Sequence, residues 1–314
     1  MLKKIFMTVI LLLAVLSFVV SLLGGKNNSA VKQAEDTAGK GDKIAVIDIT
    51  GTMLSGGSGV PQLFSETTGA YSNTIMKQLR RAAKDKNVKA VLLNINSPGG
   101  SVTSAEEITE EIQRFKKDSK KPIVATMGNA GASAAYYVAA NCDKIYANPS
   151  TLTGSIGVYI GSKNLEELYK KLGITDVMIK SGVHKDILSG ARPMTAEERT
   201  ILQSMVDEMF ESFLQTVSIG RKLPLEQVRA LADGRVYTGR QAKNLKLVDE
   251  LGNYYDALAG TAELAKIEGE PSVVKYDSVQ DWRSWFSGQL AGMISARVLE
   301  SLQLPADTAV WHKG

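Results

Sequence analysis

Ser133 is the lone serine in the run MGNAGASAAYY (127–137), where small residues stand on both sides of it. The strand-like run KPIVATMG ends just before this serine, and AAYYVAANC can form a helix just after it. At such a junction the free amides of the first helical turn and the helix dipole favour a developing negative charge. The run therefore suits a serine nucleophile approached by a substrate backbone, although a small-residue helix packed closely on a sheet would give the same pattern.

A second strand-like run ends in SPGG (97–100), where Gly99 and Gly100 permit a tight turn with unusual φ values. Such a turn can aim its amides at one point, as an oxyanion hole requires. By itself SPGG indicates only a turn. Together with Ser133 it supplies two parts of an acyl-transfer site, and the general base remains to be identified.

Two adjacent residues of SGVHKDILSG (181–190) are candidates for that base. His184 would form a Ser-His pair, but nothing marks a particular carboxylate to orient it, so an ordinary loop residue is the alternative. Lys185 can act as a base only if its pKa falls from ~10.4 to ~7–8, a change that burial of the ammonium produces. Without other information, a solvated surface charge is the better explanation of the lysine.

A sheet is needed to position these residues, and from Lys43 onward strand-like and helix-like runs alternate. Several strand-like runs are too apolar to have a wet face, which is typical of a covered, mostly parallel sheet. We expect strands at 43–50, 89–96, 121–128, 144–149 and 176–182, and crossover helices at 73–86 and 104–118. A longer helix at 195–220 begins with a capping box, Thr195 and Glu198. The sequence therefore predicts an α/β fold built from β-α-β units.

The N-terminus predicts a membrane anchor. Residues 5–23 carry no charge and approach the ~20 residues that a bilayer core requires. A cleaved signal peptide is the alternative, but its apolar region is shorter and ends in a small-residue cleavage site. Lys3 and Lys4 favour a cytoplasmic N-terminus, with the rest of the chain on the far side of the membrane. The polar, Gly-rich residues that follow, up to 42, are typical of a flexible tether.

Composition excludes several other classes of function. The chain has 314 residues and a net charge of only +4, without a dense basic block, so nucleic acid is not an expected partner. Cys142 is the only cysteine, which rules out an intrachain disulfide and a cysteine-based metal cluster. With His184 and His312 as the only histidines, a zinc site is not expected either.

Four motifs in register resemble the signal peptide peptidase A family of membrane-bound Ser/Lys proteases, over residues 43–277. They are LLNINSPGGSV, MGNAGASAAYYVAANCDKIYANPSTLTGSIGV, IKSGVHKDI and ADGRVYTGRQAKNLKLVDELG. The resemblance implies a crotonase-like (Clp-type) fold, a β-α-β superhelical core with a parallel sheet, preceded by one transmembrane helix. It implies Ser133 as nucleophile, Lys185 as general base and Ser155 as a hydroxyl that orients the lysine.

The resemblance also implies an oxyanion hole made by the amides of Gly100 and Ala134, with Gly99 as the alternative to Gly100. One departure is that Ala134 and Ala135 follow the serine where the family often has glycines. Alanine keeps its amide hydrogen, so the hole survives, while the added methyl groups narrow the cleft. No cofactor or metal is required.

The expected organisation is an N-terminus and anchor at 1–25, a tether at 26–42, a catalytic domain at 43–280 and a C-terminal segment at 281–314. The resemblance implies remnant signal peptides as substrates, and contact with the bilayer through residues 5–23. It also implies a homo-oligomeric ring or dome that shares active sites between subunits. The protein is then a single-pass cell-membrane protein whose catalytic domain is extracytoplasmic.

Two segments have weaker assignments. The stretch 232–252 suits architecture and subunit contact better than chemistry. The region from Asp281 carries an apolar helical stripe for a partner helix, a membrane surface or its own domain, and we hypothesise that residues 304–314 enter the active-site groove. A crotonase-type acyl-CoA enzyme and a noncatalytic membrane scaffold are the rival functions. Neither explains a lone serine among small residues together with Lys185 and an anchor.

Overall fold

The structure is a computed structural model that describes residues 41–56 and 69–276 of the 314-residue chain. All of these residues lie in one compact unit, Ala38–Gly314. The expected membrane span at 5–23, nearly all of the tether at 26–42 and the segment at 281–314 lie outside the described residues. Among the helices of the two described ranges, none combines the length and the apolar character needed to cross a bilayer.

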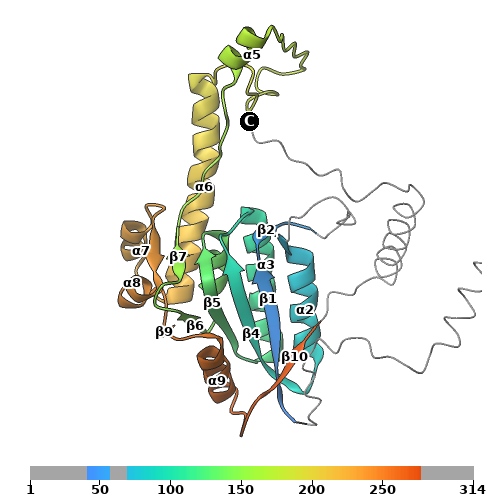
Figure 1. The fold of residues 1–314 in the computed structure, drawn as a ribbon, viewed down its shortest axis with the longest axis vertical. Helices are drawn as coiled ribbons and strands as arrows, with labels where there is room; N and C mark the ends of the chain where they lie inside the picture. Colours follow the sequence, from blue (N-terminus) through green and yellow to red (C-terminus); the bar gives the residue numbers. More distant parts are fainter. Residues whose placement is uncertain (1–40, 57–68, 277–314) are drawn as a thin grey trace, which may run out of the picture. The chain divides into compact units, whose positions relative to one another are not determined.

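The core of the described part is an eight-stranded sheet whose longest path runs β10-β1-β4-β5-β6-β9, with every neighbouring pair parallel (Figure 1). β7 pairs in parallel with β5, and β8 pairs antiparallel with β7. The bounds are β1 Lys43–Thr50, β4 Val88–Ser97, β5 Ile123–Ala132, β6 Lys144–Ala147, β7 Leu152–Gly154, β8 Val236–Thr238, β9 Glu250–Leu251 and β10 Ser272–Lys275. Four of the five expected strands are thus confirmed, as is the α/β fold with a mostly parallel sheet.

Helices cover both faces of this sheet, which is why its strands are apolar on both sides. The helices α2 (Ser72–Lys84), α3 (Val102–Ser119) and α4 (Ala134–Ala139) contribute to one hydrophobic cluster, and α9 (Tyr254–Leu264) contributes to a second. Along β1, Ile47 belongs to the first cluster and the preceding Val46 to the second. The alternation of side chains along a strand therefore connects β1 to both layers.

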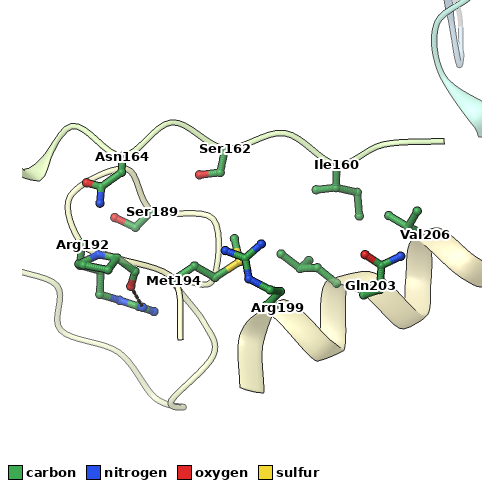
Figure 2. Close-up of a pocket in the computed structure, with 11 residues that line it drawn as sticks. Ile160, Ser162, Asn164, Ser189, Arg192, Met194, Arg199, Gln203 and Val206 are labelled. Atoms are coloured by element: carbon green, nitrogen blue, oxygen red, sulfur yellow. Dashed lines mark hydrogen bonds between the residues drawn. The ribbon is translucent and has the colours of Figure 1, made fainter. Parts of the chain in front are cut away.

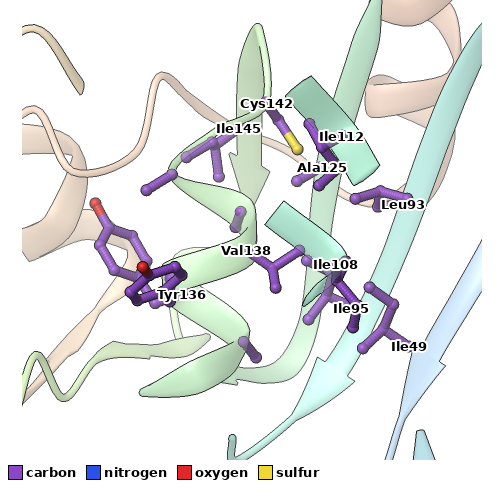
Figure 3. Close-up of a cluster of buried hydrophobic side chains, with 14 of the residues drawn as sticks. Ile49, Leu93, Ile95, Ile108, Ile112, Ala125, Tyr136, Val138, Cys142 and Ile145 are labelled. Carbon is purple, nitrogen blue, oxygen red and sulfur yellow. The ribbon is translucent and has the colours of Figure 1, made fainter. Parts of the chain in front are cut away.

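The first cluster holds the strand ends in place. Figure 3 shows Ile108 of α3 and Val138 of α4 beside Leu93 and Ile95 of β4, and all four side chains are completely buried. Burying each such side chain contributes ~1.5–3 kcal/mol relative to leaving it exposed. This packing fixes α4 against β4 and β5, and so fixes the junction at which α4 begins.

The fifth expected strand, at 176–182, is wrong: the segment forms no strand in the structure. It lies in what we call the arm, residues 159–195, which contains the short helix α5 (Glu166–Leu172) and leads into α6 (Ala196–Arg221). Val177 is 75% exposed and Ile179 is 96% exposed. A strand needs a neighbour for its backbone hydrogen bonds, and within the described residues none pairs with this segment.

The helix α6 links the arm to the core. Its predicted start is confirmed, because Thr195 and Glu198 form both hydrogen bonds of a capping box. Near its other end, the Phe213 ring lies 5.0 Å from the ring of Tyr137 in α4. Gly220 approaches α4 so closely that a Cβ there would lie 2.1 Å from the Ala140 carbonyl oxygen.

The remaining elements are short. They are the parallel pair β2 (Thr52–Leu54) and β3 (Gly69–Tyr71), and the helices α7 (Leu225–Leu231) and α8 (Gly239–Asn244). The stretch 232–252 supplies β8, α8 and β9, so the architectural part of its prediction is confirmed. Its expected role in subunit contact stays a prediction.

Candidate active site

Ser133 lies where β5 ends and α4 begins, as the sequence predicted. Its backbone has φ 55° and ψ −125°, a conformation that a residue with a Cβ adopts only under strain. The hydrogen bond from its amide to the Gly154 carbonyl, 2.8 Å long, helps to hold this geometry. From 131 to 140, Ser133 is the one residue that is not buried. The fold therefore leaves Ser133 partly exposed and buries its neighbours in this run.

The SPGG turn lies directly against this serine. A Cβ at Gly99 would lie 2.8 Å from the Ser133 Cβ and 2.9 Å from the Ala134 nitrogen, so only glycine fits there. Gly99 has φ 105° and Gly100 has φ 156°, which confirms the unusual turn. At Gly100 a Cβ would lie 2.2 Å from the Met53 carbonyl oxygen. Gly99 thus brings the turn against the serine at a spacing that no side chain permits, and Gly100 lets the same turn lie against the backbone of Met53.

The hydrogen bonds of this turn distinguish its two candidate amides. The Gly99 amide donates to the Ser97 hydroxyl at 3.1 Å, so it is already engaged. The backbone of Met53 pairs with the residues on either side of Gly100, while the Gly100 amide has no acceptor among the described residues. Ala134 stands at the first position of α4, where an amide has no acceptor inside its helix. Gly100 and Ala134 are therefore the amides free for a ligand.

Ser155 follows the neighbouring strand at the same edge of the sheet. β5 and β7 are parallel, with Ala132 opposite Gly154, so Ser133 and Ser155 each come one residue after a paired position. Neighbouring strands lie ~4.8 Å apart, which places the two serines side by side. Ser155 also has a positive φ, 50°, and its amide donates to the Arg235 carbonyl at 2.9 Å. The structure thus brings together Ser133, the glycine turn, Ala134 and Ser155.

The two candidates for the base lie elsewhere in the chain. Lys185 is exposed on a turn of the arm, and the ring of His184 faces the carboxylates of Glu197 and Glu198 at 3.6 and 3.9 Å. These glutamates belong to the first turn of α6, whereas the contact of α6 with α4 is at Phe213. At 1.5 Å per residue the two points are about 22 Å apart along the helix. One chain therefore does not bring Lys185 or His184 to Ser133.

Sequence reasoning did not consider Lys121, whose pKa burial lowers. Its ammonium donates to the carbonyls of Ala82, Ala83 and Asp85, at 2.8, 3.1 and 2.7 Å, where α2 ends. With all three protons engaged, this lysine satisfies orphan carbonyls of a helix C-terminus and is no base. Burial also raises the pKa of the Cys142 thiol, which suits the small buried hydrophobe expected from the sequence.

A hollow of about 440 Å³ opens in the arm (Figure 2). Segment 160–164, the loop that ends at Met194 and the first half of α6 line it, with Arg192 and Arg199 among the side chains. None of the site residues predicted from the sequence lines this hollow. It therefore lies between the arm and the first half of α6, and none of the strand ends that carry Ser133 lines it.

Comparisons with family models and with known proteins give matches that cover most of the chain. The family model described as "Peptidase family S49" matches residues 115–268, and the model described as "Clp protease" matches residues 43–153. The chain is 42% identical to "Putative protease slr0021" of Synechocystis sp. over 76% of this chain and 79% of that protein. It is 33% identical to "Putative signal peptide peptidase SppA" of Enterococcus faecium, over 89% and 86%. "Protease 4" of Salmonella typhi is 34% identical over 88% of this chain and 43% of its own length.

Proposed function

The chain belongs to peptidase family S49 and is a serine protease, and from that premise we propose that Ser133 is its nucleophile and Lys185 of a neighbouring copy its general base. The observation that carries the nucleophile is the strained Ser133, the one unburied residue of its run, held against Gly99 and the Ala134 amide. A hydroxyl beside free amides is the arrangement that acyl transfer needs.

In the proposed reaction, the Ser133 hydroxyl attacks the carbonyl carbon of a peptide bond and passes its proton to the neutral amine of Lys185. The amides of Gly100 and Ala134 hold the negative oxygen of the tetrahedral intermediate. Lys185 then gives the proton to the leaving amine as the C–N bond breaks, which leaves an acyl group on Ser133. A water molecule then attacks this ester and passes a proton to Lys185, and the Lys185 ammonium returns that proton to the Ser133 oxygen as the acyl–oxygen bond breaks, which restores both side chains.

Two observations support a base from another copy. Lys185 lies at one end of α6 and the contact with α4 lies near the other. The arm exposes several large apolar side chains, among them Val177, Ile179 and Val183, in the manner of surfaces that another protein covers. A neighbouring arm laid over the strand ends would also bury the lysine, which lowers the pKa of an ammonium. Ser155, beside Ser133, would then orient the incoming amine.

The proposal includes the wider expectations from the sequence. These are the crotonase-like, superhelical form of the fold, a transmembrane helix at 5–23 and a ring or dome of identical subunits. The N-terminus is cytoplasmic and the catalytic domain is extracytoplasmic. The substrates are remnant signal peptides and other unfolded apolar peptides, for which a catalytic domain tethered beside the bilayer is suited. The name of the Enterococcus faecium relative supports this substrate class.

The test is complementation between two inactive variants of the full chain, purified in detergent. Ser133→Ala and Lys185→Ala each abolish cleavage of a fluorogenic apolar peptide when assayed alone. When the two are mixed and allowed to exchange subunits, about a quarter of the sites in a randomly assembled ring combine an intact serine with an intact lysine. Activity that returns on mixing supports a shared site. An inactive mixture of exchanged subunits refutes sharing, and an active Lys185→Ala refutes the lysine as base.

A further inference from the structure

Arg192 connects the turn that carries Lys185 to the start of α6. Its guanidinium donates to the Asp186 carboxylate through Nε and Nη2, at 3.0 and 2.7 Å. It also donates to the Glu198 carboxylate through Nη1 and Nη2, at 2.9 and 2.5 Å. One planar fork therefore makes four hydrogen bonds to two carboxylates, more than the three donors of a lysine allow.

Both carboxylates are almost completely enclosed: the side chain of Asp186 is 7% exposed and that of Glu198 is 2% exposed. Hydrogen bonds from Arg192 hold the pKa of Asp186 well below its usual range and lower that of Glu198 to about 2. Both groups are therefore ionised at neutral pH. Enclosed charges need a partner, and removing that partner leaves them uncompensated.

The two ends of this connection differ in rigidity. Glu198 also accepts from the Thr195 amide at 2.9 Å, as part of the capping box, so it is fixed to a helix of 26 residues. Asp186 lies in a turn and comes directly after Lys185. Lys180 donates to the same Asp186 carboxylate at 2.6 Å and to the Val183 carbonyl at 2.9 Å, which closes the turn around residue 185.

We propose that Arg192 is a positioning residue for Lys185, acting through Asp186 to fix the turn against α6 so that the amine points toward a neighbouring copy. This inference rests on the proposed function, in which Lys185 is the base. Lys185 itself has no contact with Arg192 in the described hydrogen bonds and ion pairs. The effect of Arg192 is therefore on the backbone from which the lysine extends.

The chain offers a matched control in Arg229. This arginine of α7 binds Glu211 of α6 with two hydrogen bonds of 2.6 and 2.8 Å, so it also makes a forked pair with the same helix. Glu211 is close in sequence to Phe213, at the part of α6 that contacts α4 and away from the arm. Arg192→Lys and Arg229→Lys each keep the positive charge and lose the fork. They differ in whether the lost fork holds the Lys185 turn.

The experiment compares the full chain with Arg192→Lys, Asp186→Asn and Arg229→Lys on the fluorogenic peptide, with thermal melting to confirm folding. Displacing a catalytic group by ~1 Å lowers kcat about 10²-fold, and we expect a loss of that order for Arg192→Lys and Asp186→Asn with KM nearly unchanged. Arg229→Lys stays close to the parent. If Arg192→Lys and Asp186→Asn both match Arg229→Lys while Lys185→Ala is inactive, the positioning role is overturned and the proposed base stands.

A second readout separates positioning from a general structural role. The Arg192→Lys substitution is introduced into the parent and into Lys185→Ala. In each background we compare the rate of hydrolysis of an activated nitrophenyl ester, whose leaving group needs no proton, with and without the substitution. A residue that acts only through Lys185 lowers the rate in the parent background and not in Lys185→Ala. Equal losses in both backgrounds overturn the proposal. If Lys185→Ala itself cleaves the peptide at the parent rate, the proposed function and this inference fail together.

Discussion

The strand ends that carry Ser133 and the arm that carries Lys185 differ in how much of their structure one chain supplies. At the strand ends, backbone pairing between β5 and β7 and a cluster of buried apolar side chains fix each candidate group. In the arm, α5 has no buried residue and the segment 176–182 pairs with no strand within the described part of the chain. Under the proposed mechanism this difference has a consequence: one chain builds the nucleophile and its amides in advance, and a neighbouring copy supplies the base.

Substitution of Gly100 by alanine is expected to have the largest effect, because it acts on the prebuilt half. A Cβ there would lie 2.2 Å from the Met53 carbonyl oxygen, so the turn must move and its amide moves with it. Loss of one oxyanion-hole donor lowers kcat about 10²- to 10³-fold. Gly161→Ala in the arm is the control, since its nearest neighbour would be at an ordinary 3.7 Å. Equal kcat values for the two variants would contradict the assignment of Gly100.

Two substitutions that shorten an apolar side chain compare how much the sheet and the arm each contribute to the stability of the fold. Leu93 is completely buried in the sheet, and its replacement by alanine should lower the free energy of unfolding by about 2–5 kcal/mol. Ile179 is 96% exposed, and Ile179→Ala should change it by less than about 0.5 kcal/mol. Urea titrations at low protein concentration, where subunits separate, measure both. A large loss for Ile179→Ala under those conditions would mean that the arm packs within its own chain.

A charge placed on the arm should have a smaller effect on the fold and a clear one on assembly. Ile179→Asp puts a carboxylate where the proposed neighbour packs, and an enclosed unpaired charge is costly. We expect smaller species in analytical ultracentrifugation and a fall in peptidase activity of about tenfold, since exposed apolar patches mark interfaces. Tyr255→Asp, on the exposed side of α9, is the control. An unchanged oligomer with full activity would place the interface elsewhere.

The same contrast explains what could be predicted from the sequence. The apolar runs of β1, β4, β5 and β6 and the glycines at 99 and 100 depend on local pattern and steric need, so their structures were predictable. The run 176–182 has a strand's composition, yet a strand also needs a neighbour, and no strand among residues 41–56 and 69–276 pairs with it. The choice of Gly100 over Gly99 depends on a hydrogen bond from the Gly99 amide to Ser97, which residue types alone do not reveal. Arg192 was missed because no motif marks it.

As the pH falls, the arm should lose its local stability before the sheet does. The folded-state pKa of Glu198 is lowered from 4.5 to about 2, mainly by hydrogen bonds from Arg192, and that of Asp186 is lowered as well. A carboxyl whose pKa is depressed by folding contributes stability that is complete above its ordinary pKa and is lost as pH falls toward the folded value. Cleavage by pepsin within 180–194, normalised to an unfolded reference peptide, should therefore accelerate from pH 4.5 to 2 while the β4–α3 region stays intact.

In Arg192→Lys the folded-state pKa values of Asp186 and Glu198 lie nearer the ordinary ones, so the pH dependence of cleavage should be flatter. If the parent and Arg192→Lys showed the same pH dependence of cleavage, Arg192 would not determine the acid stability of the arm.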